Sequence, residues 1–573
     1  MKTVIDFNRK WLFSAKEKDG EKTVSDTVLT LPFFHSVSTM PEGTFTAVWT
    51  PEEKDEGNTA YIEFSQISGE VTVFCDGKEV YTHKSIQTPF TVPLALDVKA
   101  GKDYEIKVSV TPLDRGDGMF CFASASVITA GSSHFTVTDK GKGLYVKPRL
   151  HENTGVISIE TEVTRPNNYD VVSYTVTDMK GVEIISATEK PTAPSITLEI
   201  PAPEIWDGQN GAYLYTLRAQ LLRDSSVLDE IVTSFGFREA SFGADGFFWL
   251  NGFRLPLNGI KLSDLHSLKT DLRNTVRLDC NALMIGLLPS KTDILSFCDK
   301  EGILLWYCLP YSGDNNKDEE ALREFLLLYR NSPSLAFIVF DEKADNDYFE
   351  KMKCIVNTLA PDVICAVSRD IDKASGNIPV SAPLTVLTLS SDDSPEAYIA
   401  FNGRFRELQE KYPDKLFAIF AKSPEKTSMS PEKYLERQIR LWQSFSRQRN
   451  IVAYFPGNLS DGKEPSSGRG LVSDSRTALY DAFWFCKSQF SSDGFIKIAT
   501  PEEYETLSKT VDIKCITNRS NLRMLVNGKD KKYKAEKASD GIYIFRGIKL
   551  SKDENVIEVS ADDECDSITL FRI

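Results

Sequence analysis

Four carboxyl groups follow predicted strands in the middle of the chain. They are Asp264, Asp341, Glu342 and Asp370. Each comes directly after a short apolar run, and in a parallel barrel the carboxyl ends of the strands converge on one face. Carboxyl groups that converge in this way can donate and remove protons. The positions therefore predict acid–base chemistry, provided that the surrounding segments build such a barrel.

Metal and thiol chemistry receive little support from the residue types. The five histidines are scattered along the chain, so no histidine metal site and no cofactor is predicted. The ten cysteines form no Cys-x-x-Cys pair, and most lie in apolar runs such as 303–310. This pattern predicts reduced, buried thiols and disfavours zinc or disulfide-exchange sites.

The composition limits the partners that the protein can have. The 573 residues carry a net charge of −15, which disfavours binding to nucleic acid. No basic amphipathic stretch indicates a membrane surface, and no apolar run is long enough to cross a bilayer. The N-terminus lacks the apolar core of a secretion signal. A cytoplasmic location is expected for the chain as written, or a periplasmic or secreted one if a signal was removed.

Two kinds of periodicity divide the chain into four predicted domains. Residues 1 to about 240 alternate between apolar and polar positions or run β-branched, with Asp-Gly turns, which indicates two β-sandwiches joined near residue 133. Strand patterns return after about residue 505 and predict a small third sandwich. The predicted boundaries are 1–133 (jelly roll), 134–240 (immunoglobulin-like), 241–500 (barrel) and 501–573 (C-terminal sandwich).

The barrel prediction rests on eight apolar runs that alternate with amphipathic helices. The strands are expected at 256–262, 281–286, 303–310, 335–342, 363–369, 384–390, 416–423 and 451–458. The helices are expected at 290–302, 318–331, 348–360, 395–412, 431–448 and 476–490. Eight strand–helix units over this length are typical of a (β/α)8 barrel.

The order of these segments resembles glycoside hydrolase family 2, the family of β-galactosidases and β-glucuronidases. The segments that carry the resemblance are "FNRKWLF" (7–13), "LPFFHS" (31–36), "NGAYLYTLRAQL" (210–221), "SFGFREASFGADGFFWLNGFRLPLNGI" (234–260), "RNSPSLAFIVFDE" (330–342) and "RGLVSDSRTALYDAFWFCKS" (469–488). The resemblance implies retaining hydrolysis of β-glycosides, in which one carboxyl group protonates the leaving oxygen and a second attacks the sugar carbon.

The two catalytic positions of the family match this sequence unequally. Glu342 matches the acid/base, and Asp341 stands where the family usually has asparagine. Ala421 falls at the position of the nucleophile, and a methyl group cannot attack an anomeric carbon. Lys422 and Ser423 follow it, but neither is an expected nucleophile for a glycosidase.

Other family positions that bind sugar are also exchanged. The family's His-Glu after the first strand corresponds to Ser263 and Asp264, its Arg and His after the second strand to Met284 and Leu287, and its glutamate on the third strand to Cys308. The remaining candidates for sugar contact are Asp341, Asp264, Asp370, Tyr307, Tyr311 and Tyr454. With Glu342, either Asp264 or Asp370 could activate water in an inverting reaction.

The sequence leaves two hypotheses of different classes. The first is a non-catalytic relative that binds carbohydrate or acts as a scaffold. The second is an active β-glycosidase of β-galactosidase type, which uses Glu342 as acid/base with an unrecognised nucleophile. The expected partner in either case is a β-glycoside or oligosaccharide, and the resemblance also allows a homo-oligomer. A third reading, different chemistry in the same barrel, has no motif that supports it.

Overall fold

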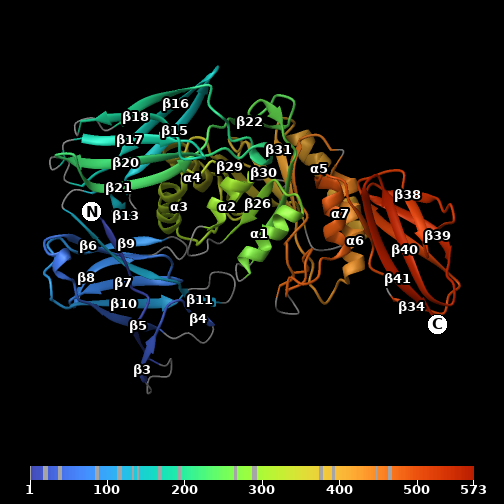
Figure 1. Ribbon diagram of the computed structural model, residues 1–573, viewed down its shortest axis with the longest axis horizontal. Helices are drawn as coiled ribbons and strands as arrows, with labels where there is room; N and C mark the ends of the chain where they lie inside the picture. Colours follow the sequence, from blue (N-terminus) through green and yellow to red (C-terminus); the bar gives the residue numbers. More distant parts are fainter. Residues whose placement is uncertain are drawn as a thin grey trace.

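The computed structural model consists of a central barrel with β-sandwiches on both sides (Figure 1). Two sandwiches, built from residues 3–130 and 137–235, lie on the left of Figure 1, and the C-terminal sandwich lies on the right. The structure describes residues 2–573 except 17–22, 37–41, 84–88, 113–118, 132–133, 139–140, 165–168, 170, 191–194, 264–266, 287–292, 373–377, 390–393, 447, 463–467 and 502.

Eight parallel strands close the barrel, as predicted. They are β25 (Leu257–Leu262), β26 (Ala282–Ile285), β27 (Leu304–Leu309), β28 (Leu335–Phe340), β29 (Ile364–Asp370), β30 (Leu384–Leu389), β31 (Leu416–Ala421) and β32 (Ile451–Phe455). Each strand pairs with the next, and β25 pairs with β32 to complete the ring. The strands are almost continuously apolar because both of their faces are buried.

Seven helices surround the barrel in the described residues. They are α1 (Leu268–Arg277), α2 (Asp293–Glu301), α3 (Asn315–Tyr329), α4 (Asn346–Leu359), α5 (Pro395–Lys411), α6 (Pro431–Phe445) and α7 (Asp481–Phe490). The sequence did not predict α1, whose apolar residues are few. After β29 the described residues 371–372 and 378–383 contain no helix, so the fifth unit differs from the predicted strand–helix pattern.

Alternate residues of each barrel strand face the interior and the surrounding helices. Met284, Trp306 and Phe420 belong to the interior cluster, in which Trp306 stacks on Phe337 with ring centres 4.0 Å apart. Their neighbours in sequence pack outward against the helices. Gly259 is required where β25 passes β32, because a Cβ atom there would lie 2.1 Å from the Phe455 ring.

The N-terminal sandwich has two main sheets. One contains β1 (Thr3–Asp6), β12 (Ala125–Ala130), β6 (Thr59–Phe64) and β9 (Phe90–Ala95) in that order. The other contains β3 (Thr23–Leu29), β2 (Trp11–Lys16), β5 (Gly43–Trp49), β10 (Tyr104–Pro112), β7 (Gly69–Cys75) and β8 (Lys78–His83). A small pair joins β4 (Phe33–Ser36) to β11 (Met119–Phe122). Trp11 and Phe45 are fully buried between the sheets.

The second sandwich is smaller. Its sheets are β15 (Leu144–His151), β16 (Thr154–Thr161) and β19 (Ser195–Pro201), and β18 (Glu183–Glu189), β17 (Val171–Thr177), β20 (Tyr215–Arg223) and β21 (Ser226–Phe235). The short pair β13 (Val137–Thr138) and β14 (Gly141–Lys142) precedes it. The hairpins β22 (Ala240–Phe242), β23 (Phe248–Leu250) and β24 (Phe253–Arg254) lead from it into the barrel.

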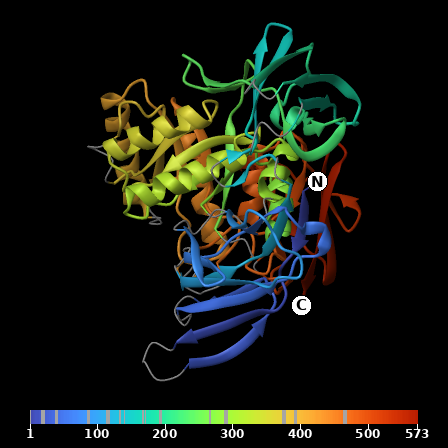
Figure 2. The ribbon, with the colours of Figure 1, turned by 90° about the vertical axis from the view of Figure 1, so that its left-hand side faces the viewer.

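The C-terminal sandwich packs against α7, through Ile516 and Ile542, which join the outer cluster of the barrel. Its sheets are β33 (Ile496–Ile498), β35 (Thr510–Thr517), β39 (Ile542–Lys549) and β38 (Ala535–Ser539), and β34 (Glu505–Thr506), β41 (Glu564–Arg572), β40 (Asp553–Ala561), β36 (Arg523–Val526) and β37 (Lys529–Asp530). Figure 2 shows the two N-terminal sandwiches on different sides of the barrel. The sandwich-and-barrel fold is thus confirmed.

Polar contacts fix the N-terminal sandwiches to α3. The fully buried His83 of β8 places its Nε2 3.2 Å from Oε2 of Glu324. At the end of α3, the amide of Asn331 accepts a hydrogen bond from the Val146 N–H and donates one to the Leu144 carbonyl, at 2.9 and 3.0 Å. Among the described residues, no helix is both long and apolar enough to traverse a bilayer.

Candidate functional site

The candidate site is the carboxyl end of the barrel, where the strand ends converge. On each strand, inward-facing and outward-facing side chains alternate. Among the described residues, seven inward-facing ones lie nearest this end of the barrel. They are Lys261 on β25, Met284 on β26, Cys308 on β27, Ser368 and Asp370 on β29, Thr388 on β30 and Phe420 on β31. Asp264 and Leu287 lie outside the described residues. The face therefore mixes apolar groups with a few polar ones.

Strand β31 brings no carboxyl group to this face. Ala421 is fully buried and belongs to the cluster between the barrel wall and helices α5 and α6. Its neighbour Phe420 belongs to the interior cluster. The ammonium group of Lys261 lies 5.0 Å from the centre of the Phe420 ring, within the range of a cation–π contact. The interior position on this strand end is thus aromatic.

The two acids after β28 lie in the turn that follows the strand. Both are half-buried, and Asp341 accepts a hydrogen bond from the Lys343 N–H through its Oδ1 at 3.0 Å. Burial lowers the pKa of Arg369, and the carboxylates of Asp341 and Glu342 oppose that shift. Both carboxylates are therefore close enough to Arg369 to interact with its charge.

Arg369 braces this turn from the helix side of the wall. Its side chain is buried, and it donates hydrogen bonds to the carbonyl oxygens of Ala344 and Ser368, both at 2.8 Å. A weaker contact of 3.4 Å reaches the Glu342 carbonyl. These contacts hold the backbone that carries Glu342 in place.

Polar side chains on β29 and β30 lie close to one another. The hydroxyls of Ser368 and Thr388 lie 3.2 Å apart. Asp370 accepts a hydrogen bond from the Asp372 N–H at 2.9 Å and so caps the turn after β29. Its carboxylate is half-buried at the end of the strand.

Cys308 and Met284 bring a weakly polar and an apolar side chain to this face. Burial raises the pKa of the Cys308 thiol to about 11, although the Lys261 charge acts in the opposite direction. The thiol therefore stays neutral at physiological pH. Met284 is buried in the barrel interior, and Ser263 is exposed just after β25.

Two predicted sugar-stacking residues face away from the site. Tyr307 is fully buried and stacks on Phe325 of α3, with ring centres 4.0 Å apart. Tyr454 is buried against α6, and its hydroxyl donates to Oε1 of Gln438 at 2.9 Å. Both predictions are wrong, because each residue lies on the outward-facing register of its strand. Tyr311 is half-buried and packs edge-on against Tyr348.

Lys261 is a candidate that the sequence reasoning overlooked. Its position was visible in the pattern, because Leu257 and Gly259 precede it on the same interior register of β25. A second overlooked feature is a buried network in the turns after β32. There Asp461 accepts hydrogen bonds from Tyr480 at 2.8 Å and from Arg469 at 3.2 Å. Within the described ranges no cluster of three metal-ligating side chains occurs.

Comparison with known proteins identifies similar sequences and structures. The family model described as "Glycosyl hydrolases family 2" matches residues 142–238. A putative beta-glucuronidase of Formosa agariphila is 25% identical over 282 residues, which cover 45% of this chain and 33% of that protein. A beta-galactosidase of Thermoanaerobacter pseudethanolicus is 24% identical over 413 residues, or 62% of this chain and 54% of that protein.

A solved structure matches the whole chain. The FMN-binding beta-glucuronidase from Facaelibacterium prausnitzii L2-6 aligns with a TM-score of 0.86 and 20% identity, covering 100% of this chain and 98% of that one. In contrast, the matches to the curated relatives named above span only 33% and 54% of their length.

Proposed function

We propose that this chain, whose residues 142–238 match the model of glycosyl hydrolases family 2, binds a β-glycoside or oligosaccharide at the carboxyl end of its barrel without hydrolysing it by the family's retaining mechanism. Carbohydrate is the substrate class named by its β-glycosidase relatives.

One observation carries the proposal: no carboxyl group is present in β31 or in the three residues that follow it, Lys422, Ser423 and Pro424. Retaining hydrolysis requires two carboxyl groups about 5–5.5 Å apart. Neither Phe420 nor Ala421 carries an acid, so the strand lacks a carboxyl nucleophile whichever of the two takes that position. The next acid, Glu425, is exposed and forms a β-bridge with Gly468.

The groups that remain at the barrel mouth suit binding better than catalysis. Lys261 can donate to sugar hydroxyls, while Asp341, Glu342 and Asp370 can accept from them. The apolar Met284 and Phe420 offer surface for the C–H face of a sugar ring. A ligand pocket of this type needs only a few convergent polar groups in an apolar frame.

The alternative is an active β-glycosidase that uses Glu342 as acid/base with another carboxyl group as base. The observation in its favour is that Asp341, Glu342 and Asp370 follow the neighbouring strands β28 and β29 and are all half-buried. An inverting pair with Asp370 would require a carboxyl separation of about 6.5–9.5 Å.

Turnover of aryl β-glycosides separates the two functions. A panel of nitrophenyl β-glycosides would be offered to the wild type and to Glu342→Gln, because an aryl leaving group departs with little help from an acid. The proposal expects no release above buffer from either protein, together with saturable binding of at least one oligosaccharide in calorimetry. Turnover by the wild type would instead establish a glycosidase, and the response of Glu342→Gln would show whether Glu342 belongs to its site.

A further inference from the structure

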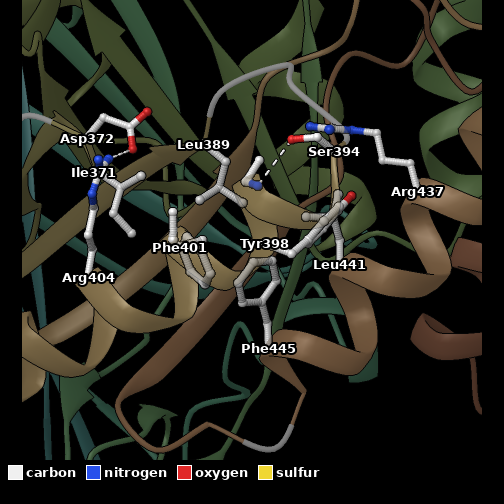
Figure 3. Close-up of a pocket in the computed structure, with 12 residues that line it drawn as sticks. Ile371, Asp372, Leu389, Ser394, Tyr398, Phe401, Arg404, Arg437, Leu441 and Phe445 are labelled. Carbon is white, nitrogen blue, oxygen red and sulfur yellow. Dashed lines mark hydrogen bonds and ion pairs between the residues drawn. The ribbon is translucent and has the colours of Figure 1, made fainter.

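A cavity lies outside the barrel wall, between helices α5 and α6 (Figure 3). Its volume is about 310 Å³, near the lower end of about 300–1,000 Å³ for small-molecule pockets. It opens beside the ends of β29 and β30, where Ile371 and Leu389 contribute to its lining. Residues 373–377 and 390–393, which flank it in the chain, are outside the described part of the structure.

The floor of the cavity is apolar and rigid. Phe401 of α5 and Phe445 of α6 meet edge to face with ring centres 4.8 Å apart, and both are buried. Leu389 and Leu441 complete this floor and are also buried. Because these side chains are held by packing on both helices, the floor can receive a flat apolar group without rearrangement.

The rim of the cavity is rich in guanidinium groups. Arg404 of α5 forms an ion pair with Asp372 on one side (Figure 3). Arg437 of α6 lies on the other side, is 1% exposed and donates a hydrogen bond to the Lys422 carbonyl at 3.2 Å. A third guanidinium, that of Arg440, lies 5.6 Å from the ring centre of Tyr398, which also lines the cavity.

Arg404 is the arginine best placed to release its ion-pair partner, Asp372, and bind a ligand anion instead. Its side chain is 42% exposed and that of Asp372 is 48% exposed. An ion pair at such exposure contributes little to stability, so a ligand anion could replace Asp372 at little cost. A planar guanidinium also matches the geometry of carboxylate and phosphate groups.

We propose that this cavity is a binding site for a small aromatic anion, with the ring on the Phe401–Phe445 floor and the carboxylate or phosphate on Arg404. The site is separate from the barrel mouth and does not depend on the function proposed for it. It lies directly behind the end of β31, since Leu389 accepts a hydrogen bond from the Lys422 N–H at 3.2 Å.

Calorimetry with 1-naphthyl phosphate tests the proposal on the full chain. We expect saturable binding that weakens at least tenfold in Arg404→Gln. The matched control is Arg406→Gln, which changes an exposed arginine on the same helix that does not line the cavity. This control should bind as the wild type does, and 1-naphthol should bind at least tenfold more weakly than its phosphate.

A second variant tests the location without disturbing the core. Ala400 lines the cavity but is itself exposed, so Ala400→Trp fills the opening and leaves the packing intact. We expect this variant to lose binding while its circular dichroism and melting temperature stay unchanged. Absence of binding to the wild type, equal affinity for 1-naphthol, or binding that survives both Arg404→Gln and Ala400→Trp would overturn the proposal.

Discussion

The ammonium nitrogen of Lys261 lies 5.0 Å from the centre of the Phe420 ring, so a cation and an aromatic face meet at the carboxyl end of the barrel. The two residues belong to β25 and β31, which are separated in the ring only by β32. Retaining hydrolysis of a glycoside needs two neighbouring carboxyl groups, whereas this pair offers a hydrogen-bond donor and an apolar surface.

Replacing Lys261 by methionine should weaken oligosaccharide binding about tenfold. Methionine keeps much of the apolar side chain but removes the charged donor, whose hydrogen bonds contribute about 1.5–3 kcal/mol each. Calorimetry with the oligosaccharide that binds the wild type measures the change, and Lys269→Met, on the exposed surface of α1, is the control. Equal affinities for both variants would show that Lys261 does not contact the sugar.

Substitution of His83 should weaken the contact between the N-terminal sandwich and α3. In His83→Ala, the buried carboxylate of Glu324 loses a hydrogen-bonding partner, which costs about 1–3 kcal/mol of unfolding free energy. Limited proteolysis and thermal unfolding would detect the change. If the pair is coupled, the effects of His83→Ala and Glu324→Gln should combine less than additively in the double variant. Strict additivity would contradict a direct interaction.

The ion pair between Asp271 and Arg476 should be essential for anchoring α1. Both side chains are at least 96% buried, and the two hydrogen bonds are each 3.0 Å long. Arg476→Ala should lower the unfolding free energy by about 3–5 kcal/mol, because it removes the positively charged partner of a buried carboxylate. Arg476→Lys should also lower the unfolding free energy, since lysine cannot form the bidentate contact with Asp271.

The control for this prediction is Arg273→Ala, which removes an exposed arginine from the same helix. Chemical denaturation of the three variants, followed by near-ultraviolet circular dichroism, measures the difference. A wild-type-like midpoint for Arg476→Ala would mean that packing alone holds α1 in place.

Asp299 should make the barrel less stable as the pH rises. Burial raises the pKa of this carboxyl group in the folded state, although hydrogen bonds from Ser332 and Ser334 oppose the shift. The folded state therefore holds its proton more tightly than the unfolded state. Stability should fall as the pH rises from the unfolded pKa of about 3.9 through the raised folded value.

Asp299→Asn should remove this pH dependence, because an amide does not ionise. The amide can still accept the hydrogen bond from the Ser334 N–H. Melting temperatures across acidic to neutral pH should thus converge at low pH and favour the asparagine variant at neutral pH. The control is Asp563→Asn, whose carboxyl group is exposed. A constant difference between Asp299→Asn and the wild type at every pH would exclude the ionisation effect.

The sequence predicted the elements of the barrel better than the directions of its side chains. All eight strands were found, because apolar runs buried on both faces stand out in the sequence. The same continuity hides which residues point inward, and a shift of one residue reverses the face. Tyr307 and Tyr454 were therefore assigned to the site although they face helices, and Lys261 was missed although it faces the interior.

The predictions about helices and boundaries had other limits. Helix α1 was missed because its sequence, "LKTDLRNTVR", has only three apolar residues and is held partly by the buried Asp271–Arg476 contact. Such a contact joins residues 205 positions apart and leaves no local signal. The cavity between α5 and α6 likewise depends on how two helices pack and not on a sequence motif. The domain boundaries and the role of Glu342 remain predictions.

Asn331 has a consequence for how the chain could be divided. Strand β15 is the outer strand of its sheet, and the Asn331 amide pairs with two of its backbone groups. An unpaired outer strand is a template for intermolecular pairing. A barrel separated from the second sandwich would leave that strand uncovered at this point. The asparagine thus occupies two backbone groups of an outer strand, and truncation between the two parts should yield a fragment that self-associates, as size-exclusion chromatography would detect.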